Sequence, residues 1–205
     1  MTEDEAQAWL SANVSRETIV KLARFRELLL AENEHQNLIA APSIAQSWAR
    51  HIVDSVQLAR LAPHVHDWLD IGSGPGLPGM PLAIVAGVPV RLIEPRRRRV
   101  EFLRRAVGDL GLDKVTVLDG VVEQVAGPVA HAITARAVAA LPKLFALAQH
   151  LAARPTIWVL PKGKSAETEL ESARAEWQGE FQLVASVTDP TSRIVVARNV
   201  RRRGT

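Results

Sequence analysis

Several residue types are missing from this chain, and each absence excludes a kind of chemistry. None of the 205 residues is cysteine, so the fold needs no oxidising compartment and no thiolate can serve as a nucleophile or metal ligand. Tyrosine is absent as well, which removes a common proton donor of active sites. Every apolar run is interrupted by charge, and residues 1–5 are acidic rather than signal-like. We therefore expect a cytoplasmic protein that enters no membrane and requires no metal.

Charge is moderate in total but unevenly distributed. The net charge is +3, yet residues 91–105 hold seven arginines against two glutamates, whereas residues 1–66 hold six basic against eight acidic side chains. A basic block of this kind is typical of proteins that bind nucleic acid. The alternative is a solvated helix face. The length suits one domain with a core of its own, and we expect a monomer.

The most informative stretch is a glycine-rich turn after a short apolar strand at residues 68–71. Glycine is needed where the backbone takes a positive φ or where a ligand lies directly on it. Four glycines fall within eight residues, at Gly72, Gly74, Gly76 and Gly79. We therefore predict a ligand-binding turn, with an ordinary loop as the alternative.

Two classes of cofactor bind to such a turn. Residues 74–79 match the dinucleotide fingerprint G-x-G-x-x-G, but Pro75 and Pro78 each lack the N–H that would bind a pyrophosphate. Asp70, followed by glycines at alternate positions, fits better a ligand without phosphate whose ammonium group can meet the carboxylate. S-adenosylmethionine is such a ligand, so the pattern favours it over a nicotinamide dinucleotide.

From residue 68 onward, strand and helix patterns alternate, which predicts an α/β fold with a parallel sheet covered on both faces. The N-terminal third is expected to be helical, with a capping box at Thr2 and Glu5, an N-cap at Ser15 and a break at residues 41–43. The expected strands are residues 68–71, 90–93, 115–118, 132–134, 156–160, 182–187 and 193–197. We expect a single domain over residues 1–205, with a helical extension at 1–66 and a cofactor-binding core at 67–200.

Further helices are expected at three places. A helix is expected from Ile44 to near Pro63, because apolar side chains between residues 44 and 56 have helical spacing. It places His51 and Asp54 one turn apart, where the pair either packs the helix or lines the site. Pro95 is expected to open a basic helix that runs to Leu110, and another helix is expected at residues 166–177. Residues 201–203, all arginine, are interpreted as a disordered tail, with an RNA contact as the alternative.

Charged side chains stand at the carboxyl ends of the expected strands, where open α/β sheets bind ligands. Glu94 follows Gly72 by 22 residues and can accept hydrogen bonds from both ribose hydroxyls, unless it is a surface acid. Arg136 can hold a carboxylate or an RNA phosphate, unless it pairs with a neighbouring acid. The candidates for contacts with RNA phosphates are Arg96, Arg97, Lys162 and Lys164.

Four segments together resemble one family: residues 70–82, 51–55, 134–137 and 160–163. They are similar to the bacterial 16S rRNA guanine-N7 methyltransferases, first labelled glucose-inhibited division protein B, and the likeness covers roughly residues 20–200. The resemblance implies a Rossmann-like class I S-adenosylmethionine-dependent methyltransferase fold, with a mostly parallel seven-stranded sheet whose last strand is antiparallel. It also implies methylation of guanine N7 in 16S rRNA of the small ribosomal subunit, at guanine 527 of the 530 loop.

The resemblance also supplies site residues. Val122 and Glu123 match the pair that binds adenine in the family, and Arg136 matches a cofactor contact. The family usually has arginine where this chain has Val121, so that contact is made otherwise here or not at all. The full set of expected cofactor-binding residues is Asp70, Gly72, Ser73, Gly74, Leu77, Glu94, Val122, Glu123 and Arg136.

The missing residues agree with that activity. Methylation of a pyrimidine at C5 needs a thiolate, and exocyclic amines are usually methylated beside an Asn/Asp-Pro-Pro-aromatic turn, where residues 135–138 read Ala-Arg-Ala-Val. Guanine N7 has an in-plane lone pair and no proton, so no catalytic base is expected. Two alternatives stay open: an NAD-dependent oxidoreductase, for which no proton donor is evident, and an inactive cofactor-binding RNA-binding module.

Overall fold

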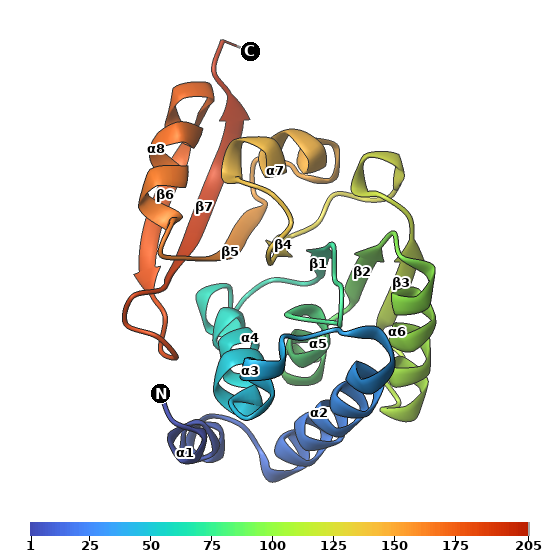
Figure 1. Ribbon diagram of the computed structural model, residues 1–205. Coiled ribbons are helices and arrows are strands. Elements are labelled where there is room, and N and C mark those ends of the chain that lie inside the picture. Colours follow the sequence, from blue (N-terminus) through green and yellow to red (C-terminus); the bar gives the residue numbers. More distant parts are fainter. Residues whose placement is uncertain (205) are drawn as a thin grey trace.

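A seven-stranded sheet forms the centre of the computed structural model, which describes residues 1–204 (Figure 1). The strand order is β3-β2-β1-β4-β5-β7-β6. The first five strands run parallel, and β7 is antiparallel to both of its neighbours, as predicted. The strands are β1 (Trp68–Ile71), β2 (Val90–Glu94), β3 (Val115–Asp119), β4 (Ala132–Ala135), β5 (Ile157–Gly163), β6 (Trp177–Ala185) and β7 (Arg193–Arg202).

Helices cover both faces of the sheet because the buried parallel strands are apolar on both sides. Trp68 and Leu69 are adjacent in β1 and enter opposite cores. The N-terminal helices, α5 and α6 pack on one face, and α7 and α8 on the other. The helices are α1 (Glu3–Asn13), α2 (Arg16–Gln36), α3 (Ala41–Ile44), α4 (Asp54–Val56), α5 (Gly79–Ala86), α6 (Arg97–Asp109), α7 (Leu141–Ala148) and α8 (Ala166–Glu176). Within residues 1–204, no helix combines the length and apolarity that crossing a bilayer requires.

The helical N-terminal third is confirmed, but its interruption lies elsewhere. Both predicted caps form, at Thr2 and Ser15. The chain leaves α2 at Asn37, which takes a left-handed conformation with φ 51°, and residues 41–43 start the short helix α3 instead of breaking a helix. Asparagine tolerates this conformation better than most residues, which makes it a C-terminal signal of the helix.

The helix expected from Ile44 to near Pro63 is present in an irregular form. It contains a π-helix at Trp48–Val53, the single turn α4, and a 3₁₀ helix at Gln57–Leu61. Both carboxylate oxygens of Glu3 accept the N–H groups of Trp48 and Ala49 at 3.1 and 2.9 Å. The first turn of α1 therefore caps this irregular segment.

Two predicted starts in the second half were wrong. Helix α6 begins at Arg97, because Arg96 has extended backbone and donates its N–H to Glu94 at 2.9 Å. Strand β6 begins at Trp177, directly after α8, and it carries a bulge at Gly179.

The C-terminal arginines are ordered, so the prediction of a disordered tail was wrong. Arg201 and Arg202 extend β7 and pair with the start of β6. Arg203 donates its side-chain Nε–H to the carbonyl of Arg174 at 2.7 Å, and its backbone N–H to the carbonyl of Glu176. A run of arginines gives no sequence signal of strand pairing. The pairing with β6 and the contacts of Arg203 nevertheless hold these residues beside α8.

Candidate functional site

The glycine turn after β1 has the backbone conformation that the sequence predicts. Gly72, Gly74 and Gly76 have φ angles of 63°, 54° and 86°, a region that side chains disfavour. Gly79 is glycine for another reason: a Cβ there would lie 2.3 Å from Leu92 and 2.6 Å from the Asp70 carboxylate. Three glycines thus shape the turn, and the fourth lets α5 approach the sheet.

Asp70 lies beneath this turn and is fully buried. Its Oδ2 accepts the N–H of Gly79 at 3.0 Å, while Oδ1 has no hydrogen-bond partner among residues 1–204. Burial raises the pKa of Asp70 to about 7 against the lowering effects of Ser73, Gly79 and Arg136. The carboxylate therefore fastens the start of α5 to β1, and it has no exposed surface through which to meet a ligand ammonium in this conformation.

Glu94 joins the glycine turn to the start of α6. Its side chain is buried, Oε2 accepts the N–H of Gly74 at 2.7 Å, and Oε1 accepts the N–H of Arg96 at 2.9 Å. A carboxylate has about four lone-pair positions, so two acceptor positions stay available after these bonds. Glu94 is thus neither a surface acid nor saturated, and it can fix the turn and accept hydroxyls together.

The other predicted cofactor residues lie along the same edge of the sheet. Ser73 is buried in the turn, and Val122 is buried in a 3₁₀ turn after β3 whose Glu123 is exposed. Leu77 is 2% exposed and packs in the core on the α5 side, so its side chain supports the turn from below. The parallel strands bring these residues to one edge because their carboxyl ends coincide there.

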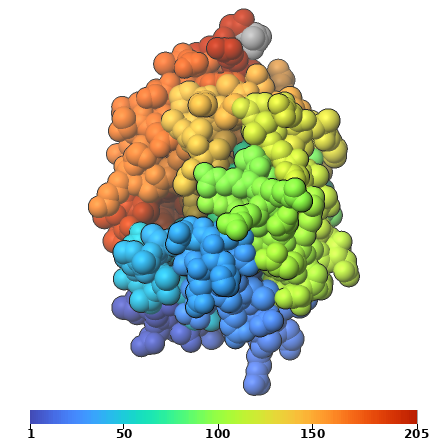
Figure 2. Space-filling view, turned by 45° about the vertical axis from the view of Figure 1, so that its right-hand side comes forward, coloured from blue at the N-terminus to red at the C-terminus, as the bar shows by residue number. Residues whose placement is uncertain are grey.

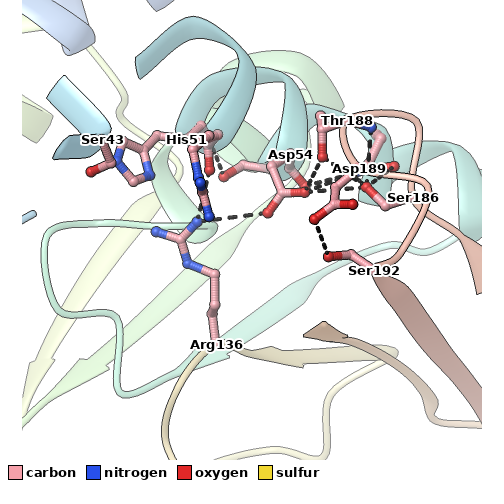
Figure 3. Close-up of polar contacts among 11 residues, drawn as sticks. Ser43, His51, Asp54, Arg136, Ser186, Thr188, Asp189 and Ser192 are labelled. Carbon is pink, nitrogen blue, oxygen red and sulfur yellow. Dashed lines mark hydrogen bonds and ion pairs between the residues drawn. The ribbon is translucent and has the colours of Figure 1, made fainter. Parts of the chain in front are cut away.

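Arg136 follows β4, and its guanidinium group points towards His51 and Asp54 of the N-terminal helical segment (Figure 3). Its Nη1 lies 3.7 Å from Asp54 Oδ2 and 3.4 Å from the carbonyl of Arg50. Burial lowers the pKa of Arg136, and Asp54 and Asp70 oppose that shift. The expected alternative, a pairing with an acid, is therefore present in this structure as a loose ion pair.

The loop after Arg136 reaches back to the glycine turn. Ala137 adopts φ 57° although it is not glycine, and Cγ2 of Val138 lies 2.7 Å from the position that a Cβ on Gly72 would occupy. A left-handed alanine needs support from its surroundings. Lys162 supplies part of it, because its Nζ donates to the carbonyl of Ala139 and pairs with Glu169 at 3.0 Å.

The four predicted RNA contacts differ in exposure. Arg96, Arg97 and Lys164 are exposed, and Arg97 pairs with Glu101 along α6 at 3.0 Å. The Lys162 side chain is only 9% exposed, so its placement suits a support for the loop better than a phosphate contact. Figure 2 shows the green segment around residue 100 standing out beside the blue N-terminal helices.

Two adjoining cavities open beside Arg136. One, of about 500 Å³, lies between the β4–α7 loop and the ends of β5 and β7. The other, of about 750 Å³, lies against the N-terminal helical segment. Asp54 and Arg136 line both, and so does Ser192 of the β6–β7 loop. Sequence reasoning missed this loop, because residues 189–192 signal only a turn.

His51 and Asp54, left open between packing and lining the site, have separate surroundings. His51 is buried, its Nε2 lies 2.9 Å from Ser43 Oγ, and burial, then Arg136 and Arg50, lower its pKa to about 4. It connects α3 to the π-helix. Both residues line the larger cavity, and Asp54 also lines the smaller one. His51 therefore packs the helical segment and faces the larger cavity at once.

The family model of GidB, described as rRNA small subunit methyltransferase G, matches residues 18–195. The chain belongs to this family. A relative named ribosomal RNA small subunit methyltransferase G from Zymomonas mobilis is 44% identical over 98% of this chain and 95% of its own length. The protein of the same name from Rhizorhabdus wittichii is 42% identical over 100% of this chain and 96% of its own.

Solved structures agree on the fold. An O-methyltransferase from Bacillus cereus in complex with SAH has a TM-score of 0.63 at 14% identity, covering 95% of this chain and 97% of that chain. A protein described as an O-methyltransferase from Klebsiella pneumoniae has a TM-score of 0.62 at 13% identity, with 96% of each chain covered. The predicted family and the methyltransferase fold are thereby confirmed.

Proposed function

We propose that this member of the rRNA small subunit methyltransferase G family methylates N7 of a guanine in 16S rRNA, at guanine 527 of the 530 loop. The family membership supports the rRNA substrate, and the resemblance of its motifs supplies the atom and the nucleotide. The observation that carries the proposal is the placement of the glycine turn, hydrogen-bonded to Glu94, and of Arg136 at the carboxyl ends of neighbouring strands, with Arg136 lining a cavity of about 500 Å³. Its place of action would be the cytoplasm, where the small subunit is assembled, and the proposal is of a monomer.

The residues present fit S-adenosylmethionine. Gly72 and Gly74 offer a backbone surface without side chains, and Glu94 has acceptor positions for two ribose hydroxyls. Val122 and Glu123 would hold the adenine, and Arg136 the methionine carboxylate, after giving up its 3.7 Å ion pair. Asp70 would act from beneath by holding the turn, which accounts for its burial.

For this reaction, the protein mainly has to hold the acceptor base and the cofactor in the correct relative position. The bound cofactor supplies an activated methyl group, and an in-line displacement needs the acceptor lone pair held against it. Guanine N7 attacks without losing a proton, so this chain needs no general base. Among residues 1–204 the site offers none of the devices for other acceptors: no cysteine occurs, and residues 135–138 lack the Asn/Asp-Pro-Pro-aromatic turn.

Binding of the RNA would rest mainly on phosphate contacts from exposed basic residues, Arg96, Arg97 and Lys164. The target base has to leave its stack to reach a buried methyl group, as in other enzymes that modify bases. The cavity beside the β4–α7 loop has room for such a base.

A methyl-transfer assay tests the proposed function. Purified protein is incubated with labelled S-adenosylmethionine and 16S rRNA or small subunits, and the product RNA is treated with borohydride and aniline. A guanine methylated at N7 is a cationic ring, so we expect strand cleavage at one site. A label on an exocyclic amine, a ribose or a protein contradicts the proposal. Binding of the cofactor without transfer to any RNA form would support an inactive RNA-binding module.

The runner-up function is distinguished by ligand binding. An NAD-dependent oxidoreductase would bind NADH, whereas the two prolines of the glycine turn remove donors that its pyrophosphate needs. Calorimetry with S-adenosylmethionine, its demethylated product and NADH gives a direct comparison. We expect heat of binding for the first two alone.

A further inference from the structure

Asp54 presents one bonded and one nearly unbonded carboxylate oxygen to the cavities (Figure 3). Oδ1 accepts from Thr188 Oγ1 at 2.8 Å, from Gln57 Nε2 at 3.0 Å and from Ser186 Oγ at 3.4 Å. These donors come from the helical segment before β1 and from the β6–β7 loop. The side chain is therefore held from two directions, in a fixed orientation.

Oδ2 lacks comparable partners. Within residues 1–204 its contact is with Arg136 Nη1 at 3.7 Å, which is longer than a hydrogen bond. The side chain is 22% exposed, so a ligand can reach it. A held carboxylate with one open oxygen is suited to accept hydrogen bonds from a bound group.

The other charged groups around the first cavity already have partners in the protein. Lys162 pairs with Glu169, whose Oε2 also accepts the N–H of Leu141 and whose Oε1 accepts from Ser165. Arg193 donates to the carbonyls of Pro190 and Ser192. Asp54 Oδ2 is the carboxylate oxygen that this wall leaves available.

We propose that Asp54 recognises the target guanine by accepting its N1–H and N2–H groups at Oδ2; this rests on the proposed function. A carboxylate repels phosphate, so it does not serve the RNA backbone. Guanine is the base that presents two adjacent donors on its Watson–Crick edge, whereas adenine, cytosine and uracil place an acceptor beside the donor. Asp54 is thus a residue that determines specificity.

The geometry is compatible with methylation at N7. Contact through N1 and N2 leaves the Hoogsteen edge, which carries N7, free of protein at Asp54. Val138 lines the same cavity and lies against Gly72 of the cofactor turn. A guanine that enters the cavity can therefore contact Asp54 with one edge while its other edge faces the cofactor side.

The first test changes the RNA alone. A synthetic fragment of the target loop is made with guanosine or with inosine, which lacks the N2 amino group, at the target position. A charge-assisted hydrogen bond lost from a buried site lowers the rate by about 10-fold or more, so we expect kcat/KM for inosine to fall by that factor. Equal rates with the two fragments overturn the proposal.

The second test changes the protein. Asp54→Asn keeps the shape but can no longer accept two donors with a charged oxygen, so kcat/KM for the guanosine fragment should fall by about 10- to 100-fold. The preference for guanosine over inosine should fall to about unity. Asp54→Glu keeps the charge and displaces the oxygen by one methylene, and it should also lose the preference. The matched control is Asp113→Asn at an exposed site between α6 and β3.

Calorimetry with S-adenosylmethionine separates recognition from a purely supporting role. If Asp54 only positioned Arg136, Asp54→Asn would weaken cofactor binding as much as methylation and leave the guanosine preference intact, which overturns the proposal. If Asp54→Asn binds the cofactor with unchanged affinity but loses the preference for guanosine over inosine, the proposal is supported. Failure of the proposed function is distinct, because the wild-type protein would then methylate no guanosine fragment at all.

Discussion

At the scale of single residues, the glycines of the turn show that one residue type answers different physical demands. Gly74 has room for a side chain, because the atom nearest to a Cβ at this position would be 3.5 Å away, but its φ is 54°. Gly79 has an ordinary φ and no room. The sequence pattern predicts that glycine is needed at both positions, but it cannot tell which demand applies where.

Gly74→Val tests the role of the turn in binding. The left-handed backbone should lower the free energy of unfolding by about 1–2 kcal/mol, and the branched side chain should obstruct the ligand. Gly111→Val is the matched control, because Gly111 has φ 58° and open space around it. We expect both variants to lose similar stability by urea denaturation, and Gly74→Val alone to lose S-adenosylmethionine binding by calorimetry. Unchanged affinity in Gly74→Val would place the ligand elsewhere.

The buried carboxyl of Asp70 should make stability depend on pH. Its pKa is 3.8 in an unfolded chain and about 7 in the fold, so the folded protein binds an additional proton between these values. Its contribution to the free energy of unfolding therefore declines as pH rises from about 4 to about 7. Asp70→Asn should remove this decline, measured by urea denaturation at several pH values. A parallel pH profile for variant and wild type would show that Asp70 is ionised throughout.

His51 changes the free energy of unfolding with pH in the direction opposite to Asp70. The effects of the two residues therefore have to be measured separately. Its pKa falls from 6.5 to about 4 on folding, so its contribution to stability is lost as pH falls from about 6.5 to about 4. The profile of His51→Gln should be flatter at the acid end. The two variants together resolve slopes that partly cancel in the wild-type protein.

At the scale of elements, the sequence predicts the regular parts well. Periodic apolar runs placed β1 at residues 68–71 as observed and β2 within one residue, since parallel strands buried on both faces leave a strong pattern. The π-helix at Trp48–Val53 leaves no such signal, because its spacing resembles that of an α-helix. The start of β6 was missed for a related reason: Gln178, Gly179 and Glu180 carry no strand pattern, and only pairing with β7 orders them.

In the candidate site, too, some features were predictable from the sequence and others were not. The places of Glu94 and Arg136 at the sheet edge were predictable, because Glu94 is the last residue of β2 and Arg136 directly follows β4. The hydrogen bonds of Asp54 to Ser186 and Thr188 were not, since they join residues more than 130 positions apart and depend on how the β6–β7 loop folds back. The burial of Lys162 was not predictable either, because a lysine flanked by Pro161 and Gly163, with Lys164 beyond, indicates an exposed position.

Lys162 is expected to stabilise the β4–α7 loop rather than bind RNA. Lys162→Met keeps the aliphatic stem but leaves Glu169 without its cation, so the free energy of unfolding should fall by about 1–3 kcal/mol. Lys164→Met, at an exposed position, should change it by less than about 0.5 kcal/mol. Thermal and urea unfolding of both variants measures this. Equal stability of the two variants would contradict a supporting role for Lys162.

At the scale of the whole molecule, the exposed cations should act on RNA through phosphates. Neutralising one phosphate contact reduces the slope of log affinity against log salt by about 0.7 to 1. We therefore expect Arg97→Ala combined with Lys164→Ala to lower affinity for related and unrelated RNA alike and to flatten the salt dependence by about two such steps. Filter binding or fluorescence anisotropy at several salt concentrations measures both quantities. An unaltered slope would mean that these side chains face solvent in the complex.

The bulge at Gly179 has a consequence for the behaviour of many copies in solution. Strand β6 is one of the two edge strands of the sheet, and an unpaired strand edge can pair with another molecule. A Cβ at Gly179 would lie 2.8 Å from the carbonyl of Arg198, so the bulge depends on glycine. A bulged edge bends and twists, which interrupts the even ladder that fibril growth needs. We therefore expect Gly179, which lies far from the cofactor turn, to limit strand pairing between molecules and so to limit aggregation.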